Sequence, residues 1–182
     1  MSDEQLMLAF AHGHRAAFDE LFLRYRQAIY AFHRRRLADP WRAEELTQET
    51  FLALFRAAAR FEPRALFRTY LYAIAYRILS AERRKAVLRA LLLPPGRREA
   101  AGREPAAEEV LWLRQALGRL ERTDREILML REFDEFTYVE IAELLKLPLN
   151  TVRSRLFRAR LALRESLEGA RPESSAALGE LS

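Results

Sequence analysis

Apolar residues recur at steps of three and four along nearly the whole of this 182-residue chain, and no segment alternates like a β-strand. The helical spacing is clearest after Ala16, where the apolar positions are Phe18, Leu21, Phe22, Tyr25, Ile29 and Phe32. Prolines interrupt the pattern at Pro40, at Pro63 and at the pair Pro94-Pro95. The sequence therefore predicts an all-α fold built from several helices.

Polar residues mark where several of these helices begin. In a capping box, a Ser or Thr and a Glu or Gln three residues later satisfy each other's backbone amides. The matching pairs are Ser2 with Gln5, Thr123 with Glu126 and Thr137 with Glu140. Asp39 is suited to cap a further helix that has Pro40 in its first position.

Two long amphipathic helices are predicted between Pro40 and Pro94. The first runs from Pro40 to about Arg60, and the second begins after Pro63 and ends at Pro94. Helical spacing predicts that the first helix buries Leu46, Thr50, Phe51, Leu54 and Phe55. In the second helix it predicts a core face made of Leu71, Ala75 and Ile78.

The segment "LLLPPGRREAAGREPAAEE" differs in character from its surroundings, because prolines and glycines are interspersed with charges. Such a composition is typical of a linker. We therefore expect two small helical domains joined by a flexible linker. The predicted parts are an N-terminal domain at 1–90, a linker at 91–107, a C-terminal domain at 108–168 and a flexible tail at 169–182.

Composition and charge exclude several classes of protein. There is no cysteine, so disulfides and thiolate metal sites are excluded, and the N-terminus lacks a secretory leader pattern. No apolar run approaches the roughly 20 residues of a membrane span, and we expect a cytoplasmic protein. His12, His14 and His33 lack the carboxylates or Gly-rich loop of an active site, so we expect no enzyme activity, metal or cofactor.

The segment around residues 137–164 predicts a helix-turn-helix. Ile141, Ala142 and Leu145 share a face of the first helix, and "KLPL" supplies a turn after which Asn150 can cap a second helix. At about 100° per residue, the second helix has one narrow apolar stripe. The stripe consists of Val152, Leu156, Ala159 and Leu163.

The rest of the second helix is rich in arginine, as is the whole chain, in which all but two of the 31 basic residues are arginine. Arginine suits bidentate contacts with phosphate and guanine. Recognition helices contact base edges through their N-terminal residues, so Thr151, Ser154 and Arg155 are assigned to base contacts. Arg153, Arg158 and Arg160 are assigned to the phosphate backbone. The alternative is an ordinary arginine-rich surface helix of a bundle.

Together, these segments resemble a known family. "LERTDREILMLREFDEFTYVEIAELLKLPLNTVRSRLFRARLALRESL" is similar to the C-terminal domain of bacterial extracytoplasmic-function (ECF) sigma factors, which belong to the sigma-70 type of RNA polymerase subunit. "FDELFLRYRQAIYAF", "AEELTQETFLALFR" and "FRTYLYAIAYRILSAERRK" resemble the N-terminal domain of that group, in the expected order. The resemblance covers about Phe10 to Leu167. It implies core RNA polymerase, promoter DNA and an anti-sigma factor as partners.

The resemblance also implies a role for each segment. "AEELTQETFLALF" would dock on the β′ clamp helices through Glu44, Glu45, Gln48 and Glu49, and the β flap would be a second polymerase contact. "FRTYLYAIAYRILSAERRK" would open the −10 element, after a loop at 61–66 that captures a flipped base. The implied −10 residues are Phe61, Arg64, Arg68, Tyr72, Tyr76, Arg77, Arg83 and Arg84. Exposed rings can stack on unpaired bases, although we expect half of the tyrosines to be structural.

The chain departs from the family pattern at five positions. Tyr70, Arg77 and Ala81 stand where Trp, Asn and Asp are usual, and Glu121 replaces a common Pro. Lys146 replaces the usual turn Gly, which predicts a non-Gly residue with positive φ.

The function expected from this sequence is that of a sigma factor. It would bind core polymerase, recognise the −35 and −10 elements and help to open the DNA, with no catalysis of its own. The alternative is a stand-alone helix-turn-helix regulator that binds duplex DNA without polymerase.

Overall fold

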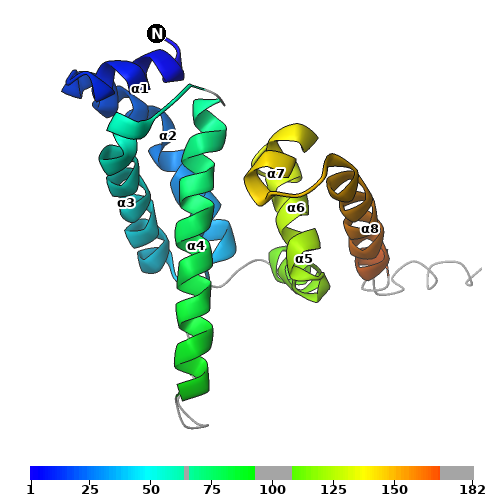
Figure 1. Ribbon diagram of the computed structural model, residues 1–182. Coiled ribbons are helices and arrows are strands. Elements are labelled where there is room, and N and C mark those ends of the chain that lie inside the picture. The colour runs from blue at the N-terminus through cyan, green and yellow to red at the C-terminus, as the bar shows by residue number, and fades with distance from the viewer. Residues whose placement is uncertain (64–65, 93–107, 169–182) are drawn as a thin grey trace, which may run out of the picture. The chain divides into compact units, whose positions relative to one another are not determined.

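The computed structural model describes residues 1–63, 66–92 and 108–168, with only the backbone described for 108–112. These residues form eight α-helices and one short 3₁₀ helix, and no strand is found among them (Figure 1). The chain divides into two compact units, Met1–Arg103 and Glu104–Ser182. Within the described ranges, no helix is both long enough and apolar enough to cross a membrane.

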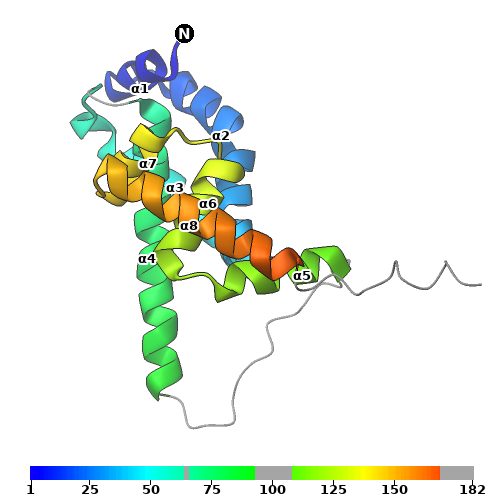
Figure 2. The same ribbon diagram turned by 90° about the vertical axis from the view of Figure 1, so that its right-hand side faces the viewer.

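The N-terminal unit is a helical bundle. Its elements are α1 (Asp3–Ala11), α2 (Arg15–Arg36), α3 (Pro40–Ala57), the 3₁₀ helix η1 (Ala58–Arg60) and α4 (Phe67–Leu92). Helices α2, α3 and α4 pack side by side, α1 lies across one end, and the far end of α4 extends beyond the other helices of the unit (Figures 1 and 2). The largest fully buried side chains are Leu6, Met7, Leu21, Ile29, Phe32, Leu46, Leu54, Phe67, Leu71 and Leu79.

Two of the predicted helix starts in this unit are confirmed. Ser2 and Gln5 form a complete capping box at α1, with N···O distances of 2.9 and 3.2 Å. The Asp39 side chain accepts a hydrogen bond from the Trp41 amide at 2.9 Å, and Pro40 occupies the first position of α3. Local sequence therefore determines where α1 and α3 begin.

Helix α1 is tied to the rest of the bundle by its acidic residues. The Glu4 carboxylate accepts a hydrogen bond from the Phe67 amide at 2.9 Å, so α1 caps the free N-terminus of α4. This hydrogen bond is the main reason why the pKa of Glu4 lies below its usual value. Asp3 accepts hydrogen bonds from Arg24 at 2.7 Å and from the Tyr25 hydroxyl. The start of α4 is thereby joined to α1, and α1 is in turn joined to α2.

The C-terminal unit consists of α5 (Glu108–Arg119), α6 (Arg122–Glu132), α7 (Tyr138–Leu145) and α8 (Leu149–Glu168). Its core includes Leu120, Ile127, Leu130, Phe136 and Ile141 together with one face of α8. The predicted capping box of Thr137 and Glu140 is present at the start of α7. Each unit therefore has its own hydrophobic core.

Four details of the sequence prediction are wrong or incomplete. Phe55 is 51% exposed rather than buried, because it lies at the edge of the buried face of α3, and Ile78 is only half-buried. Helix α6 is capped by Glu121, whose carboxylate accepts from the Thr123 amide at 3.1 Å, and not by Thr123. Asn150 lies inside the first turn of α8 instead of capping it. The predicted tail and nearly all of the predicted linker lie outside the described residues.

Candidate nucleic-acid interface

Helices α7 and α8 form a helix-turn-helix whose turn is only three residues long. Lys146 ends α7 in the left-handed region, at φ 57° and ψ 44°, as its place in the turn predicted. The Leu147 amide donates to the Ala142 carbonyl at 3.0 Å, which closes the C-terminus of α7. A side chain at this φ is unfavourable, so the surrounding packing enforces the turn that orients α8.

One stripe of α8 is fixed against the core, as its periodicity predicted. Val152, Leu156 and Ala159 are each at most 1% exposed, and Leu163 is half-buried. The stripe packs mainly on α6 and α7. Because these residues hold one side of the helix, its opposite side faces solvent.

The outer side of α8 carries the free cations of this helix. Arg153 and Arg158 are exposed, and neither has a hydrogen bond or ion pair among the described residues. Ser154 lies between them and donates to the Thr151 carbonyl at 3.1 Å. Phe157 shares this side and is 70% exposed. Phe157 was not among the predicted DNA-binding residues, although its distance from the apolar stripe in helical register already indicated an outward ring.

The arginines that flank the buried stripe are instead bound within the protein. Arg155 donates to Asp124 at 2.8 Å and also to Glu121, both near the start of α6. Arg160 donates to Glu132, at the end of α6, from Nε at 2.9 Å and from Nη2 at 2.5 Å. Each of these hydrogen bonds raises the pKa of its guanidinium. Of the residues predicted to contact the −35 element, Thr151, Arg153, Ser154 and Arg158 therefore remain available on the outer side.

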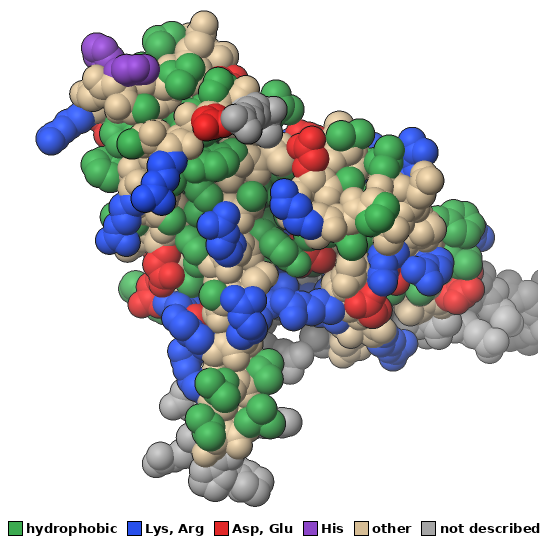
Figure 3. All heavy atoms as spheres, in the orientation of Figure 1, with side chains coloured by type: hydrophobic (Ala, Val, Ile, Leu, Met, Phe, Trp, Pro, Cys, Tyr) green, Lys and Arg blue, Asp and Glu red, His purple; other side chains and the backbone are tan. Residues whose placement is uncertain are grey.

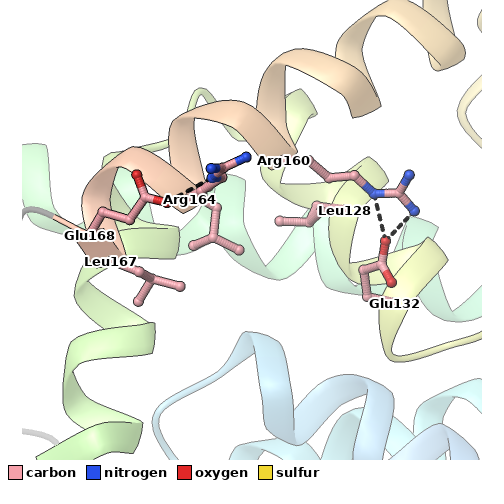
Figure 4. Close-up of a pocket in the computed structure, with 7 residues that line it drawn as sticks. Leu128, Glu132, Arg160, Arg164, Leu167 and Glu168 are labelled. Atoms are coloured by element: carbon pink, nitrogen blue, oxygen red, sulfur yellow. Dashed lines mark hydrogen bonds and ion pairs between the residues drawn. The ribbon is translucent and has the colours of Figure 1, made fainter.

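A groove of about 510 Å³ runs between α6 and α8 (Figure 4). Leu128, Leu163 and Leu167 supply its apolar lining. Its charged side chains form two ion pairs, Arg160 with Glu132 and Arg164 with Glu168. An apolar strip bordered by paired charges is suited to an apolar side chain or helix of another protein.

In the N-terminal unit, the predicted −10 residues do not all lie on the surface. Phe61 and Tyr72 are only 7% and 3% exposed, and Tyr72 packs edge-on against Phe32 with centroids 5.4 Å apart. Both rings thus belong to the core. Tyr76 is half-buried, and Arg64 lies outside the described residues.

The cations predicted to contact the −10 element lie along α4. Arg77 and Arg84 are exposed, Arg83 is half-buried, and the half-buried Arg68 has its guanidinium carbon 5.6 Å from the centroid of the Tyr72 ring. Figure 3 shows Lys and Arg side chains gathered over this part of the N-terminal unit. The far end of α4 also exposes apolar side chains, namely Val87, Leu88, Leu91 and Leu92. Helix α4 therefore presents a basic surface with apolar side chains at its end.

Helix α3 presents a second surface. The predicted polymerase-binding residues Glu44, Glu45, Gln48 and Glu49 are all exposed. Trp41, Leu52 and Phe55 are exposed on the same helix by 81%, 54% and 51%. Trp41 and Leu52 were not among the predicted polymerase-binding residues, and Phe55 was predicted to be buried. Exposed large apolar side chains, aromatic ones above all, are typical of a protein-binding site.

A helix-turn-helix with exposed arginines on the outer side of its second helix defines a DNA-binding protein. Residues 111–163 match the family model described as "Sigma-70, region 4", and residues 21–88 match "Sigma-70 region 2". The RNA polymerase sigma-H factor of Pseudomonas aeruginosa is 31% identical over 184 residues, with 91% of this chain and 94% of that protein covered. The sigma factor YlaC of Bacillus subtilis is 32% identical over 170 residues, with 88% and 97% covered.

The structure of CnrH in complex with the cytosolic domain of CnrY is similar to this chain, with a TM-score of 0.74 and 25% identity. The match covers 94% of this chain and 100% of CnrH. Other relatives include the ECF sigma factors SigE of Mycolicibacterium smegmatis and SigW of Bacillus subtilis. The chain belongs to the sigma-70 family of RNA polymerase sigma factors, within the ECF group. It is therefore a sigma factor, which directs RNA polymerase to promoters and takes part in opening them.

Proposed function

We propose that the two units divide promoter recognition between them, with α8 in the major groove of the −35 element and α4 on the −10 element. The outer side of α8 carries this proposal. Arg153 and Arg158, which have no partner within the described ranges, are suited to phosphates, while Thr151, Ser154 and Phe157 would contact base edges and thymine methyl groups. No catalytic step is assigned to the chain.

On the N-terminal unit, the proposed −10 surface consists of the cations of α4 and the partly exposed Tyr76. Opening base pairs costs a few kcal/mol per step, which phosphate contacts and stacking on the single strand must offset. Tyr70 is half-buried and packs on Phe61 with centroids 5.2 Å apart, so this pair shapes the start of α4 next to the proposed base-capturing loop. Directly after the proposed loop, Glu4 caps α4 through the Phe67 amide.

Two surfaces are proposed for core polymerase. The exposed side of α3, with Trp41, Gln48 and Leu52, would bind the β′ clamp helices. The groove between α6 and α8 would bind an apolar segment of the β flap. Because core polymerase works in the cytoplasm, the proposal places the protein there.

A regulatory protein is proposed as a further partner. The CnrH structure contains the cytosolic domain of CnrY, and the resemblance implies an anti-sigma factor for this chain. A protein that covered the exposed side of α3 would compete directly with polymerase.

A mobility-shift experiment tests this function. A promoter duplex selected from a library should be shifted specifically only when core polymerase is present with the protein. Strong and specific duplex binding by the protein alone would instead support a stand-alone regulator.

A further inference from the structure

Arg155 lies among residues assigned to DNA, but its guanidinium is bound to the protein itself. Its Nη1 donates to Asp124 at 2.8 Å and also to Glu121. The Asp124 side chain is 15% exposed and the Arg155 side chain 29%, so the cluster is partly shielded from water. Glu121 is held in place independently, because its carboxylate also accepts from the Thr123 amide and caps α6.

The charge of this cluster opposes a contact between Arg155 and DNA. Two carboxylates and one guanidinium leave a net charge of −1. If Arg155 turned toward a phosphate or a base, Glu121 and Asp124 would be left without their cation near a polyanion. Arg153 and Arg158 face no such cost, because neither has a partner to lose among the described residues.

The helical register of α8 also places Arg155 beside α6 and away from the outer side of the helix. At 100° per residue, Arg155 lies about 70° from the middle of the buried stripe, close to the contact with α6. Arg160 lies about as far on the other side of the stripe, and its carboxylate partner Glu132 is at the opposite end of α6. Ion pairs at both ends of α6 thus hold α8 on its two flanks.

We propose that Arg155 is a positioning residue, which holds the first turns of α8 on α6 through Glu121 and Asp124 and does not itself recognise DNA. This inference rests on the proposed role of α8 at the −35 element. It assigns direct recognition to Thr151, Arg153, Ser154, Phe157 and Arg158. Arg155 acts on all −35 sequences alike, because it fixes the angle of the helix and not the identity of a base.

The test compares Arg155→Gln with Arg158→Gln, a matched change on the same helix. Holoenzyme made from the full chain and core polymerase is bound to a promoter library over a range of KCl concentrations. Loss of a phosphate contact lowers the slope of log affinity against log salt by about 0.9. We expect Arg158→Gln to show this change. We expect Arg155→Gln to keep the wild-type slope and to lose about two- to five-fold in affinity on every sequence.

The double variant Glu121→Gln/Asp124→Asn provides the second arm. It should reproduce the loss of affinity on every sequence. Adding Arg155→Gln to it should cause no further loss of affinity, since the ion pairs of Arg155 are already absent. Thermal unfolding of each variant shows that α8 remains folded.

Three results would overturn the inference. Arg155→Gln could change the preferred −35 sequence, or lower the salt slope as Arg158→Gln does, or adding Arg155→Gln to the carboxylate variant could cause a further loss of affinity. A wild-type holoenzyme that selected no −35 sequence would overturn the proposed function, and the inference with it. The wild-type arm therefore distinguishes the two failures.

Discussion

At the scale of single residues, Lys146 shows how the angle of the recognition helix is maintained. Its φ of 57° places Cβ against the following carbonyl, a conformation that costs a non-glycine residue roughly 1–2 kcal/mol. The hydrogen bond from Leu147 to Ala142 keeps the turn closed in spite of this cost. The turn is therefore strained but keeps its geometry.

Replacing Lys146 by Gly should stabilise the C-terminal unit. The gain should be about 0.5–1 kcal/mol, because part of the relief is offset by the greater entropy of glycine in the unfolded chain. Urea unfolding followed by circular dichroism measures it. Lys146→Ala keeps Cβ and removes the rest of the side chain with its charge, so an equal gain in that control would show that loss of the side chain, and not relief of backbone strain, is responsible.

His33 is a buried group whose protonation couples pH to stability. It is 0% exposed, and its Nε2 lies 3.2 Å from Thr50 Oγ1. The Thr50 hydroxyl donates to the Leu46 carbonyl, so it accepts from His33, which assigns the proton to Nε2. Burial, reinforced by Arg36 and Arg83, lowers the pKa of His33 to about 3 from 6.5.

Acid should therefore destabilise the N-terminal unit through His33. Its stabilising contribution is complete above pH 6.5, where the unfolded chain is neutral, and it is lost as pH falls toward 3 because only the unfolded chain takes up the proton. Between pH 7 and pH 5 we expect a loss of about 2 kcal/mol. Urea unfolding at both pH values should show this loss in wild type but not in His33→Gln. If the free energy of unfolding depended on pH identically in the two proteins, His33 would not be the group responsible.

At the scale of elements, one cross-helix ion pair joins α3 to α4. Arg42 donates to Glu82 at 2.6 Å and to Glu45 at 2.7 Å, and the Glu82 side chain is only 9% exposed. The hydrogen bond from Arg42 lowers the pKa of Glu82. The position of α3 against α4 thus depends on a carboxylate that has little access to water.

Removing Arg42 alone should destabilise the N-terminal unit more than replacing both Arg42 and Glu82. Arg42→Ala leaves Glu82 buried without its partner and should destabilise the N-terminal unit by about 1–3 kcal/mol in urea unfolding. Arg42→Met combined with Glu82→Leu should recover most of that loss. A double variant no more stable than Arg42→Ala would show that the pair itself, and not the stranded charge, matters.

Helix boundaries were predictable where the signal is local. Asp39, Ser2 and Thr137 cap their helices as predicted, because the partner amide lies within three residues. The cap of α6 was mispredicted, since Thr123 lies inside the first turn of the helix and Glu126 is 3% exposed in the core. A motif of four residues does not predict which of its side chains other helices will bury.

In the candidate site too, the features set by local sequence were predictable and those set by distant residues were not. The buried stripe of α8 follows from helical periodicity alone, and it determines which residues face outward. The partners of Arg155 and Arg160 do not follow from it, because these long side chains reach carboxylates on α6 that are 28–34 residues away in the sequence. Tyr72 was misplaced for the same reason, as its burial depends on Phe32 of α2.

At the scale of the whole molecule, the exposed side of α3 should determine whether polymerase binds. Leu52→Glu places a charge in the proposed interface and should weaken binding to core polymerase by at least about tenfold. Leu23→Glu is the matched control, since Leu23 is 65% exposed on α2, outside that surface. Titration of labelled protein with core polymerase measures both. Equal effects of the two variants would refute the assignment of α3.

The central claim is that this chain makes core RNA polymerase specific for promoters. Run-off transcription by core polymerase on a promoter library, with and without the protein, tests it most directly. We predict that the protein stimulates initiation from a subset of templates that share −35 and −10 sequences. The absence of stimulation with any core enzyme, on any template, would contradict the claim.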